Sequence, residues 1–372
     1  MKWIRNVAAL SALVFLTPAF AEIGVSDKEI LVGQSAPLSG NNAELGEQYN
    51  AGIRTYLDWV NEHGGVFGRK IKLVVRDDAY DPAKAEVNVN YLIDEAHVFA
   101  LLGLVGTPTG KVEVPIATKN RVPVVGILSG ARVFRTPVNP YVFNVRASYC
   151  AEVLKSLEHM GPGGAARLGI VAQDDGYGED VSHCVEDYIE KVHGAIVHKV
   201  KVKRGSLEVE SAMRELASFN PSAIILASSY QPVGKMITLL RNETTTPRYY
   251  NVSFVGMESL AREMTERVGR GVIVTQVVPP SKFDMSPEGK YYRDNIGEDA
   301  SYTSYEGFLT AKLFVAALKR AGREPSRERL VAALEAAPID LGNMIVSYRP
   351  DNHSGSNYVE ETMITYKGNI GL

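Results

Sequence analysis

Short apolar stretches alternate along most of the chain with longer segments in which apolar residues recur every three or four positions. The first stretch runs from Ile30 to Ala36, and the segment after it carries six apolar side chains at helical spacing, namely Leu45, Tyr49, Ile53, Tyr56, Leu57 and Val60. Such a stretch is typical of a buried strand, and such a segment of an amphipathic helix about five turns long. Expected strands at 70–76, 98–102 and 123–128, with helices between them, extend this pattern to a βαβαβαβ run, which predicts a parallel, doubly wound sheet.

The same alternation begins again beyond Pro140, which indicates a second lobe. Five strands are expected there, at 168–172, 196–202, 223–227, 249–254 and 271–277, alternating with helices that begin near Tyr177, Ser206, Pro232 and Met257. Three helical segments follow, at 287–296, 304–321 and 326–336, before two short strands at 344–348 and 358–366. We therefore predict an α/β protein with two doubly wound parallel-sheet lobes.

Residues 1–21 have the pattern of a secretory signal peptide. Lys2 and Arg5 precede an apolar run at 7–16 that is too short to span a bilayer, and Ala19-Phe-Ala21 is a small-x-small cleavage site. We therefore expect residues 22–372 to be exported to the periplasm as a soluble protein. No Cys follows the cleavage site, so a lipid-anchored form is not expected.

Charge and cysteine content narrow the partners of the exported chain. Without Lys2 and Arg5, the 40 basic residues become 38 against 43 acidic ones, a formal net charge of −5. No basic cluster is present, so we expect no nucleic-acid partner and no binding to an anionic membrane surface. Cys150 and Cys184 share an oxidising compartment, where one disulfide between two helices flanking the same strand is the first expectation and two buried free thiols are the alternative. The seven histidines show no metal-binding spacing, and we expect no cofactor.

The apolar run 101–105 ends in a polar turn, Gly106-Thr-Pro-Thr-Gly110, before a segment typical of a helix. A strand that ends at a helix N-terminus presents free backbone N–H groups and the positive end of the helix dipole, which favour an anionic ligand group. A P-loop is excluded, because three residues rather than four separate Gly106 from Gly110 and Val112 follows Lys111. The Gly-x-Ser-x-Gly of a nucleophile elbow is absent, and nothing basic close in sequence would activate Thr107. We expect this loop to bind a ligand without reacting with it; simple capping of the helix by Thr107 is the alternative.

Residues 61–82, which begin Asn61-Glu-His-Gly-Gly-Val-Phe-Gly68 and end in Asp81-Pro82, resemble a signature of the type I periplasmic binding proteins, the leucine/isoleucine/valine-binding family. The resemblance covers essentially the whole exported chain, including Arg121-Val-Pro-Val-Val125, Asp174-Asp-Gly-Tyr-Gly178 and 349–356. It implies a small-molecule ligand held between two lobes at the carboxyl ends of the strands, and hinge closure that presents the ligand to an ABC permease in the inner membrane. It also implies a monomer.

The family pattern places three hinge crossings, near 144–148, 277–280 and 347–351. Lobe 1 is then formed by 22–146 with 278–348, and lobe 2 by 147–277 with 349–372.

The resemblance also implies a set of ligand-binding residues. Thr107 matches the family hydroxyl that binds the ligand carboxylate, and Ser129 and Ala131 match the stretch that completes this anion site. Tyr177 matches the aromatic residue that reaches across from lobe 2, and Tyr230 roughly matches another. Leu45 stands where the family often has a large aromatic residue, so that wall of the site is expected to be more open or more aliphatic.

Ser253 departs from the family pattern, because amino-acid binders carry at that position an acid paired with the ligand ammonium. A buried ammonium without an anion costs several kcal/mol, more than the roughly 1.5–3 kcal/mol of one hydrogen bond to a carboxylate. Either the ligand lacks an amine, or another acid supplies the charge. Glu306 is the first candidate, with a capping box in Thr303-Ser-Tyr-Glu306 as the alternative. Asp174 and Asp175 follow, with a solvated loop as the alternative.

The sequence thus predicts a substrate-binding protein of an ABC importer of the branched-chain amino-acid type, without enzymatic activity. Its expected ligand is a small carboxylate-bearing molecule, an amino acid in the first place and an amine-free aromatic or aliphatic acid in the second. Two other classes remain as alternatives: a sensory module that delivers ligand to a signalling receptor, and an enzyme, because export and a two-lobed fold do not exclude chemistry.

Overall fold

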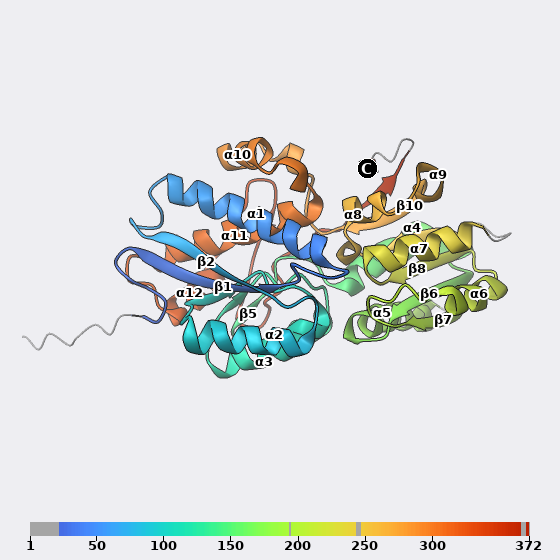
Figure 1. Ribbon diagram of the computed structural model, residues 1–372, viewed down its shortest axis with the longest axis horizontal. Helices are drawn as coiled ribbons and strands as arrows, with labels where there is room; N and C mark the ends of the chain where they lie inside the picture. Colours follow the sequence, from blue (N-terminus) through green and yellow to red (C-terminus); the bar gives the residue numbers. More distant parts are fainter. Residues whose placement is uncertain (1–21, 193–194, 243–246, 366–369, 372) are drawn as a thin grey trace, which may run out of the picture.

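The computed structural model describes residues 22–192, 195–242, 247–365 and 370–371, and shows two α/β lobes side by side (Figure 1). The expected signal peptide, residues 1–21, lies outside the described residues. In the part of the chain that is described, none of the helices has the length and apolar character needed to cross a membrane.

Lobe 1 is built on a five-stranded sheet in the order β2-β1-β3-β4-β5, in which all neighbours are parallel. Its strands are β1 (Glu29–Ala36), β2 (Lys70–Asp77), β3 (Ala100–Leu102), β4 (Val124–Val125) and β5 (Val142–Phe143). The helices packed with this sheet are α1 (Ala43–Glu62), α2 (Pro82–Asn90), which continues in a π-helical turn (Tyr91–Glu95), α3 (Thr107–Lys119), α10 (Pro287–Asn295), α11 (Tyr302–Ala321) and α12 (Arg327–Glu335). A two-stranded ribbon, β11 (Ile339–Asp340) with β12 (Ile345–Val346), follows α12.

Lobe 2 is built on a seven-stranded sheet in the order β14-β13-β10-β9-β8-β6-β7. Five neighbouring strands are parallel: β6 (Arg167–Gln173), β7 (Ile196–Val202), β8 (Ala223–Ala227), β9 (Arg248–Asn251) and β10 (Val272–Gln276). Two antiparallel strands, β13 (Glu360–Ile364) and β14 (Ile370–Gly371), extend one edge. The helices are α4 (Tyr149–Gly164), α5 (Gly176–Val192), α6 (Glu210–Phe219), α7 (Tyr230–Arg241), α8 (Met257–Arg262) and α9 (Glu266–Gly269).

These two parallel-sheet lobes confirm the predicted fold class. The chain passes between the sheets three times, after β5, after β10 and after β12. The first and third passages are bound to each other, because the Asn144 backbone N–H donates to the His353 carbonyl at 3.0 Å and Gly355 N–H donates to the Asn144 carbonyl at 2.8 Å. The buried Arg135 guanidinium fastens the first passage from lobe 1 through a 2.8 Å hydrogen bond to the Arg146 carbonyl.

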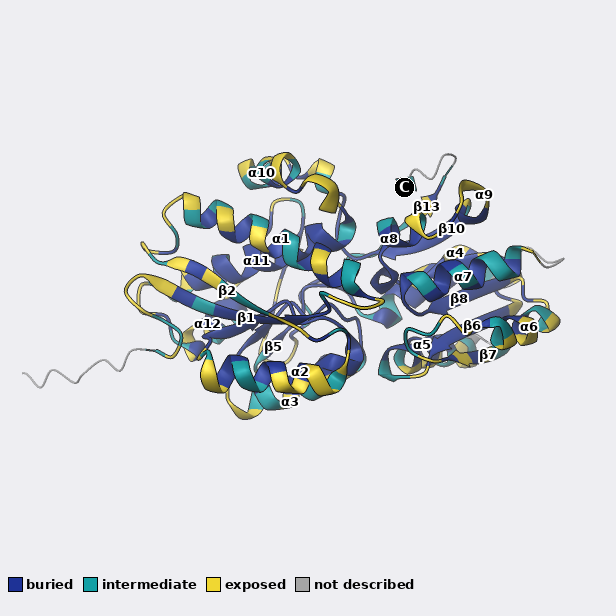
Figure 2. Ribbon diagram, viewed as in Figure 1, coloured by how far each residue is buried: buried dark blue, intermediate teal, exposed yellow. Residues whose placement is uncertain are grey.

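The buried core follows the predicted apolar stretches, and exposure is concentrated on the outer faces of the helices (Figure 2). Strands β3, β8 and β10 are buried along their whole length. In lobe 1, α1 and α11 touch backbone to backbone. A Cβ on Gly52 would lie 1.7 Å from the Ser304 carbonyl oxygen, so only glycine permits this approach. The contact brings the N-terminal half of α11 against α1.

The structure excludes two alternatives that the sequence left open about helix starts. The N-cap of α11 is Ser301, which forms a capping box with Ser304, so Glu306 does not complete a capping box with Thr303. The N-cap of α3 is Gly106, with a φ of 103° and no side-chain cap, so Thr107 does not cap the helix but occupies its first position.

Candidate functional site

Thr107, Ser129 and Ala131 lie together just beyond the carboxyl ends of β3 and β4. The Thr107 and Ser129 hydroxyls share a hydrogen bond of 2.8 Å, and the Ala131 backbone N–H donates to Ser129 Oγ at 3.2 Å. All three residues are at most 1% exposed. Because Thr107 opens α3, the N–H groups of the first helical turn and the positive end of the helix dipole lie beside the two hydroxyls. This group of residues is called the anion site below.

The anion site faces lobe 2 at close range. A Cβ on Gly176, the first residue of α5, would lie 3.5 Å from Thr107 Cγ2. Tyr149, the first residue of α4, packs on Gly130, where a Cβ would come within 2.5 Å of its ring. Burial raises the pKa of Tyr149 to about 12, and the charge of Arg146 and the hydroxyls of Ser129 and Thr107 partly offset this rise. The Tyr149 hydroxyl forms no hydrogen bond within the described residues. The site is therefore completed by the N-terminal ends of two lobe 2 helices.

Aromatic rings line the same meeting point of the lobes. The Tyr177 ring lies 5.2 Å from Tyr149 and 4.9 Å from Phe254, and Tyr80 of lobe 1 lies 5.9 Å from Phe254. The Tyr177 hydroxyl is buried and has no hydrogen-bond partner among the described residues, and burial holds its pKa well above the usual range. Leu45 adds an aliphatic wall, because it packs against Gly256 from across the lobe boundary.

Tyr230 opens another lobe 2 helix, α7. It is 4% exposed, and burial raises its pKa to about 12 with smaller contributions from Glu263 and Glu47. Among the described residues, no hydrogen bond or ring contact joins it to Thr107 or Tyr177.

Ser253 begins a 3₁₀ turn (Ser253–Val255) rather than ending a strand, since β9 stops at Asn251. Its backbone N–H donates to Glu152 Oε2 at 2.6 Å, and the Thr275 hydroxyl donates to the same oxygen at 2.5 Å. Glu152 is fully buried. An acid therefore does lie at the Ser253 position, but it arrives from the first turn of α4.

Glu152 was not predicted from the sequence, although a signal was present. The buried face of α4 carries side chains three or four positions apart, namely Tyr149, Glu152, Val153, Ser156, Leu157 and Met160. A glutamate on that face is unusual, because charged side chains are rarely buried without a specific partner. The signal is weak, however, because the helix dipole favours an acid in the first turn of any helix, whether or not it has a function.

The three acids proposed from sequence have partners within the protein. Both oxygens of Glu306 are bound by Arg146, at 2.8 Å from Nε and 2.7 Å from Nη2, and both side chains are 2% exposed. Asp174 pairs with Lys201 at 2.8 Å in a half-exposed loop. Asp175 accepts from the Tyr177 backbone N–H at 3.0 Å and so caps the start of α5. These contacts count against Glu306 as the partner of a ligand ammonium.

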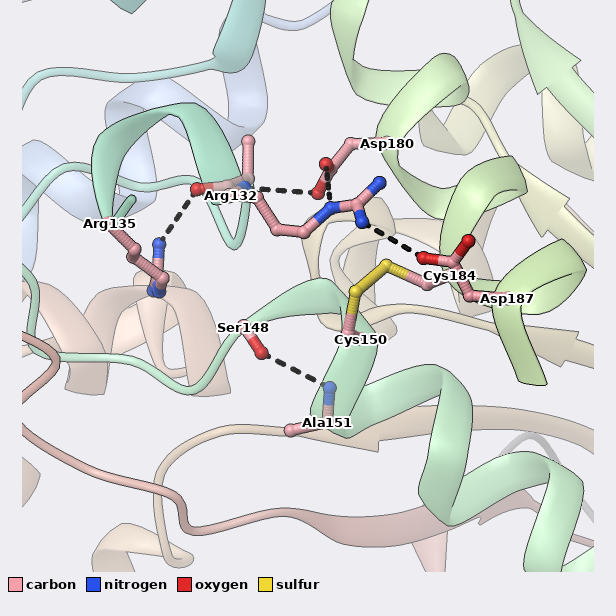
Figure 3. The surroundings of a disulfide bond; sticks show 9 residues. Arg132, Arg135, Ser148, Cys150, Ala151, Asp180, Cys184 and Asp187 are labelled. Atoms are coloured by element: carbon pink, nitrogen blue, oxygen red, sulfur yellow. Dashed lines mark hydrogen bonds and ion pairs between the residues drawn. A yellow bond between two sulfur atoms is a disulfide. The ribbon is translucent and has the colours of Figure 1, made fainter. Parts of the chain in front are cut away.

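The disulfide and two ion pairs hold α5 in place beside the anion site (Figure 3). Cys150 of α4 and Cys184 of α5, the helices before and after β6 in the chain, are joined in a disulfide with a Cα–Cα distance of 4.9 Å. Arg132, which follows the anion site in lobe 1, reaches across to α5 and pairs with Asp180 at 2.9 Å and Asp187 at 3.0 Å. In the described ranges, His, Cys, Asp and Glu side chains form no group of three or more that could hold a metal ion.

A family model described as "Periplasmic binding protein" matches residues 29–365. The chain is 24% identical over 347 residues to an amino acid binding protein from Pseudomonas aeruginosa, covering 86% of this chain and 84% of that one. It is 23% identical over 307 residues to the Leu/Ile/Val-binding protein of Escherichia coli K12, covering 79% and 78%.

Solved structures agree with this assignment. A possible leucine/isoleucine/valine-binding protein from Rhodopirellula baltica superposes with a TM-score of 0.86 at 29% identity, covering 95% of this chain and 98% of that one. A fatty acid ABC transporter substrate-binding protein from Thermomonospora curvata superposes with a TM-score of 0.83 at 20% identity, covering 95% and 93%. The predicted resemblance is confirmed: the chain belongs to the periplasmic binding proteins, in the leucine/isoleucine/valine-binding family of ABC transporter substrate-binding proteins, a family of binding proteins and not of enzymes.

Proposed function

We propose that this protein captures a small carboxylate-bearing molecule, an amino acid in the first place, between its two lobes and delivers it to an ABC permease in the inner membrane. Export to the periplasm through residues 1–21 is part of the same proposal, as are the lobe boundaries after 146, 277 and 348. The observation that carries the proposal is the anion site, in which two hydroxyls and a helix N-terminus meet where the lobes touch.

An amine-free acid is the second candidate ligand. It is favoured by Ser253, which leaves the family position for the ammonium partner without an acidic side chain of its own. The structural neighbour from Thermomonospora curvata is described as a fatty acid binder, so the scaffold accommodates acids of that class. Both candidates place the carboxylate at Thr107.

Thr107→Ala tests the site directly. We expect it to weaken carboxylate binding by about 1.5–3 kcal/mol, because a hydrogen bond to a charged group is lost. Thr107→Ser keeps the hydroxyl and is expected to restore most of the affinity. Affinities are measured by isothermal titration on protein freed of carried-over ligand by unfolding and refolding, after a thermal-shift screen of amino acids and amine-free acids.

Thr109→Ala is the matched control. Thr109 is equally buried and lies in the same turn, but its hydroxyl donates to the carbonyl of Val105, just before α3, at 2.5 Å. We expect it to lower stability slightly and to leave affinity unchanged. Equal affinity of Thr107→Ala and the wild-type protein would remove Thr107 from the site.

A further inference from the structure

Glu152 is a fully buried acid whose two oxygens have different surroundings. Oε2 accepts hydrogen bonds from the Ser253 backbone N–H at 2.6 Å and from the Thr275 hydroxyl at 2.5 Å. Oε1 is buried as well and accepts no hydrogen bond from the described residues. The Ser253 hydroxyl, which lowers the pKa of Glu152, is also buried and forms no hydrogen bond within the described residues. Buried polar atoms in native proteins are nearly always satisfied, so these two unpartnered atoms indicate a polar group of a bound ligand beside them.

Glu152 lies on the same buried face of α4 as Tyr149, which packs on Gly130 beside the anion site. Tyr149 occupies that face one turn before Glu152. The Tyr177 ring packs on Tyr149 from α5. A molecule whose carboxylate is held at Thr107 would meet Tyr149 and, one turn further along the same helix face, Glu152.

No cation among the described residues forms an ion pair with Glu152. The charged and titratable groups nearest to it are Arg146 and Arg135 ahead of α4, with Tyr149 and Tyr177 on the two helices. Arg146 already uses Nε and Nη2 to bind another carboxylate, as described above. Burial raises the pKa of Glu152, and the charge of Arg146 only partly opposes this rise. A positive charge placed beside Glu152 would oppose the same rise.

Resting on the proposed function, we propose that Glu152 binds the ammonium group of the ligand, so that the protein selects α-amino acids over acids that lack the amine. An ammonium group offers three N–H donors and a full positive charge, which match the free oxygen Oε1. The acid is supplied by the first turn of α4, and Ser253 contributes its backbone N–H, which fixes the carboxylate. The substitution at 253 thus moves the acid to another element instead of removing it.

Matched ligand pairs test this selection on the full exported chain, freed of ligand. The pairs are leucine with 4-methylpentanoate and phenylalanine with 3-phenylpropanoate, which differ only in the amine. For a pair that binds, we expect the wild-type protein to prefer the amino acid at least 100-fold. Glu152→Gln is expected to lose at least 30-fold in affinity for the amino acid and less than 3-fold for the amine-free acid. Equal losses for both members, or a wild-type protein without amine preference, would overturn the inference and leave the proposed function standing.

Failure of the proposed function gives a different result. If none of the twenty amino acids and neither of the two amine-free acids binds the wild-type protein, both proposals fall. Glu113→Gln is the control variant. Glu113 is as buried as Glu152, but it faces Asp78 inside lobe 1, where burial and that neighbouring acid hold its pKa well above the usual range. Its replacement is expected to leave the ligand preference unchanged.

Two further measurements separate ligand binding from a merely structural role. Affinity for the amino acid is expected to rise with pH as Glu152 ionises, and this rise should be missing in Glu152→Gln. The double variant Glu152→Gln/Ser253→Glu returns the acid to position 253 and is expected to regain at least 10-fold of the lost affinity. A double variant no better than Glu152→Gln would overturn the claim that the two positions serve the same ligand group.

Discussion

Replacing Glu306 by Gln is expected to destabilise the fold and to leave ligand preference unchanged. Glu306 binds Arg146 through two hydrogen bonds of 2.7 and 2.8 Å, and both side chains are 2% exposed. An amide keeps one acceptor for the guanidinium but removes the negative charge. Breaking a buried ion pair from one side costs about 3–5 kcal/mol, because the remaining charge stays buried without compensation. Glu152 also interacts electrostatically with Arg146 and partly compensates its charge when Glu306 is replaced. We therefore expect a loss of stability at the lower end of this range, about 3 kcal/mol.

The assay is urea unfolding of the ligand-free protein followed by circular dichroism. The matched variant is Arg146→Met/Glu306→Leu, which removes both charges together and is expected to recover most of the lost stability, because apolar residues of similar volume often replace buried ion pairs at no cost. Affinities for leucine and for 4-methylpentanoate should change by the same factor in Glu306→Gln. A variant as stable as the wild-type protein, or one that loses affinity for the amine-bearing ligand alone, would refute the structural role of Glu306.

Three other perturbations act at Glu258, at the disulfide and at Arg132. Burial raises the pKa of Glu258 from its ordinary 4.5 to about 7, so the folded state keeps a proton that the unfolded state loses, and stability falls as pH rises from about 4.5 to 7. Glu258→Gln should remove this fall and gain about 1–3 kcal/mol at pH 8 in urea unfolding; an unchanged pH profile would contradict this. The Cys150–Cys184 disulfide closes a sequence separation of 34, and Cys150→Ser/Cys184→Ser should cost about 2–4 kcal/mol and abolish the effect of reductant on the urea midpoint. The half-exposed Arg132 side chain pairs with two acids of α5 across the lobe boundary. Arg132→Gln should therefore weaken ligand binding by no more than about 1 kcal/mol for each lost ion pair. It should also reduce the dependence of ligand affinity on salt concentration.

The alternation of strands and helices could be predicted because it follows from local periodicity. The expected strand at 30–36 lies within β1, and the dipeptide Asp81-Pro82 is typical of a helix start: Asp81 caps α2 by accepting from the Ala83 N–H at 2.8 Å. Strand β5 was not predicted, because it has only two residues and exists through its pairing with β4. The antiparallel pairing of β13 with β10 joins segments nearly ninety residues apart, which no local pattern reveals.

In the candidate site, too, some features could be predicted from the sequence and others depend on tertiary contacts. Thr107 and Ser129 follow successive parallel strands, so their meeting at one edge of the sheet could be expected from topology. The alternative of a capping box between Thr303 and Glu306 could not be decided from sequence, because Ser301 and Ser304 fit the same local pattern and form the capping box in the structure. Glu306 then turned out to lie opposite Arg146, a partner 160 positions away in sequence.

The position of Ser253 shows why comparing one residue with a family pattern gives an incomplete answer about charge. That comparison left two possibilities, a ligand without an amine or an acid from elsewhere. A ligand ammonium responds to the carboxylate oxygen beside it. The helix or strand that carries this carboxylate does not matter. The Ser253 N–H and the Thr275 hydroxyl are donors at the ends of two neighbouring strands, and together they hold Oε2 of a glutamate more than 100 positions earlier in the chain. Because these donors orient the carboxylate and leave Oε1 free, the structure favours the second possibility, an acid that has moved to another element.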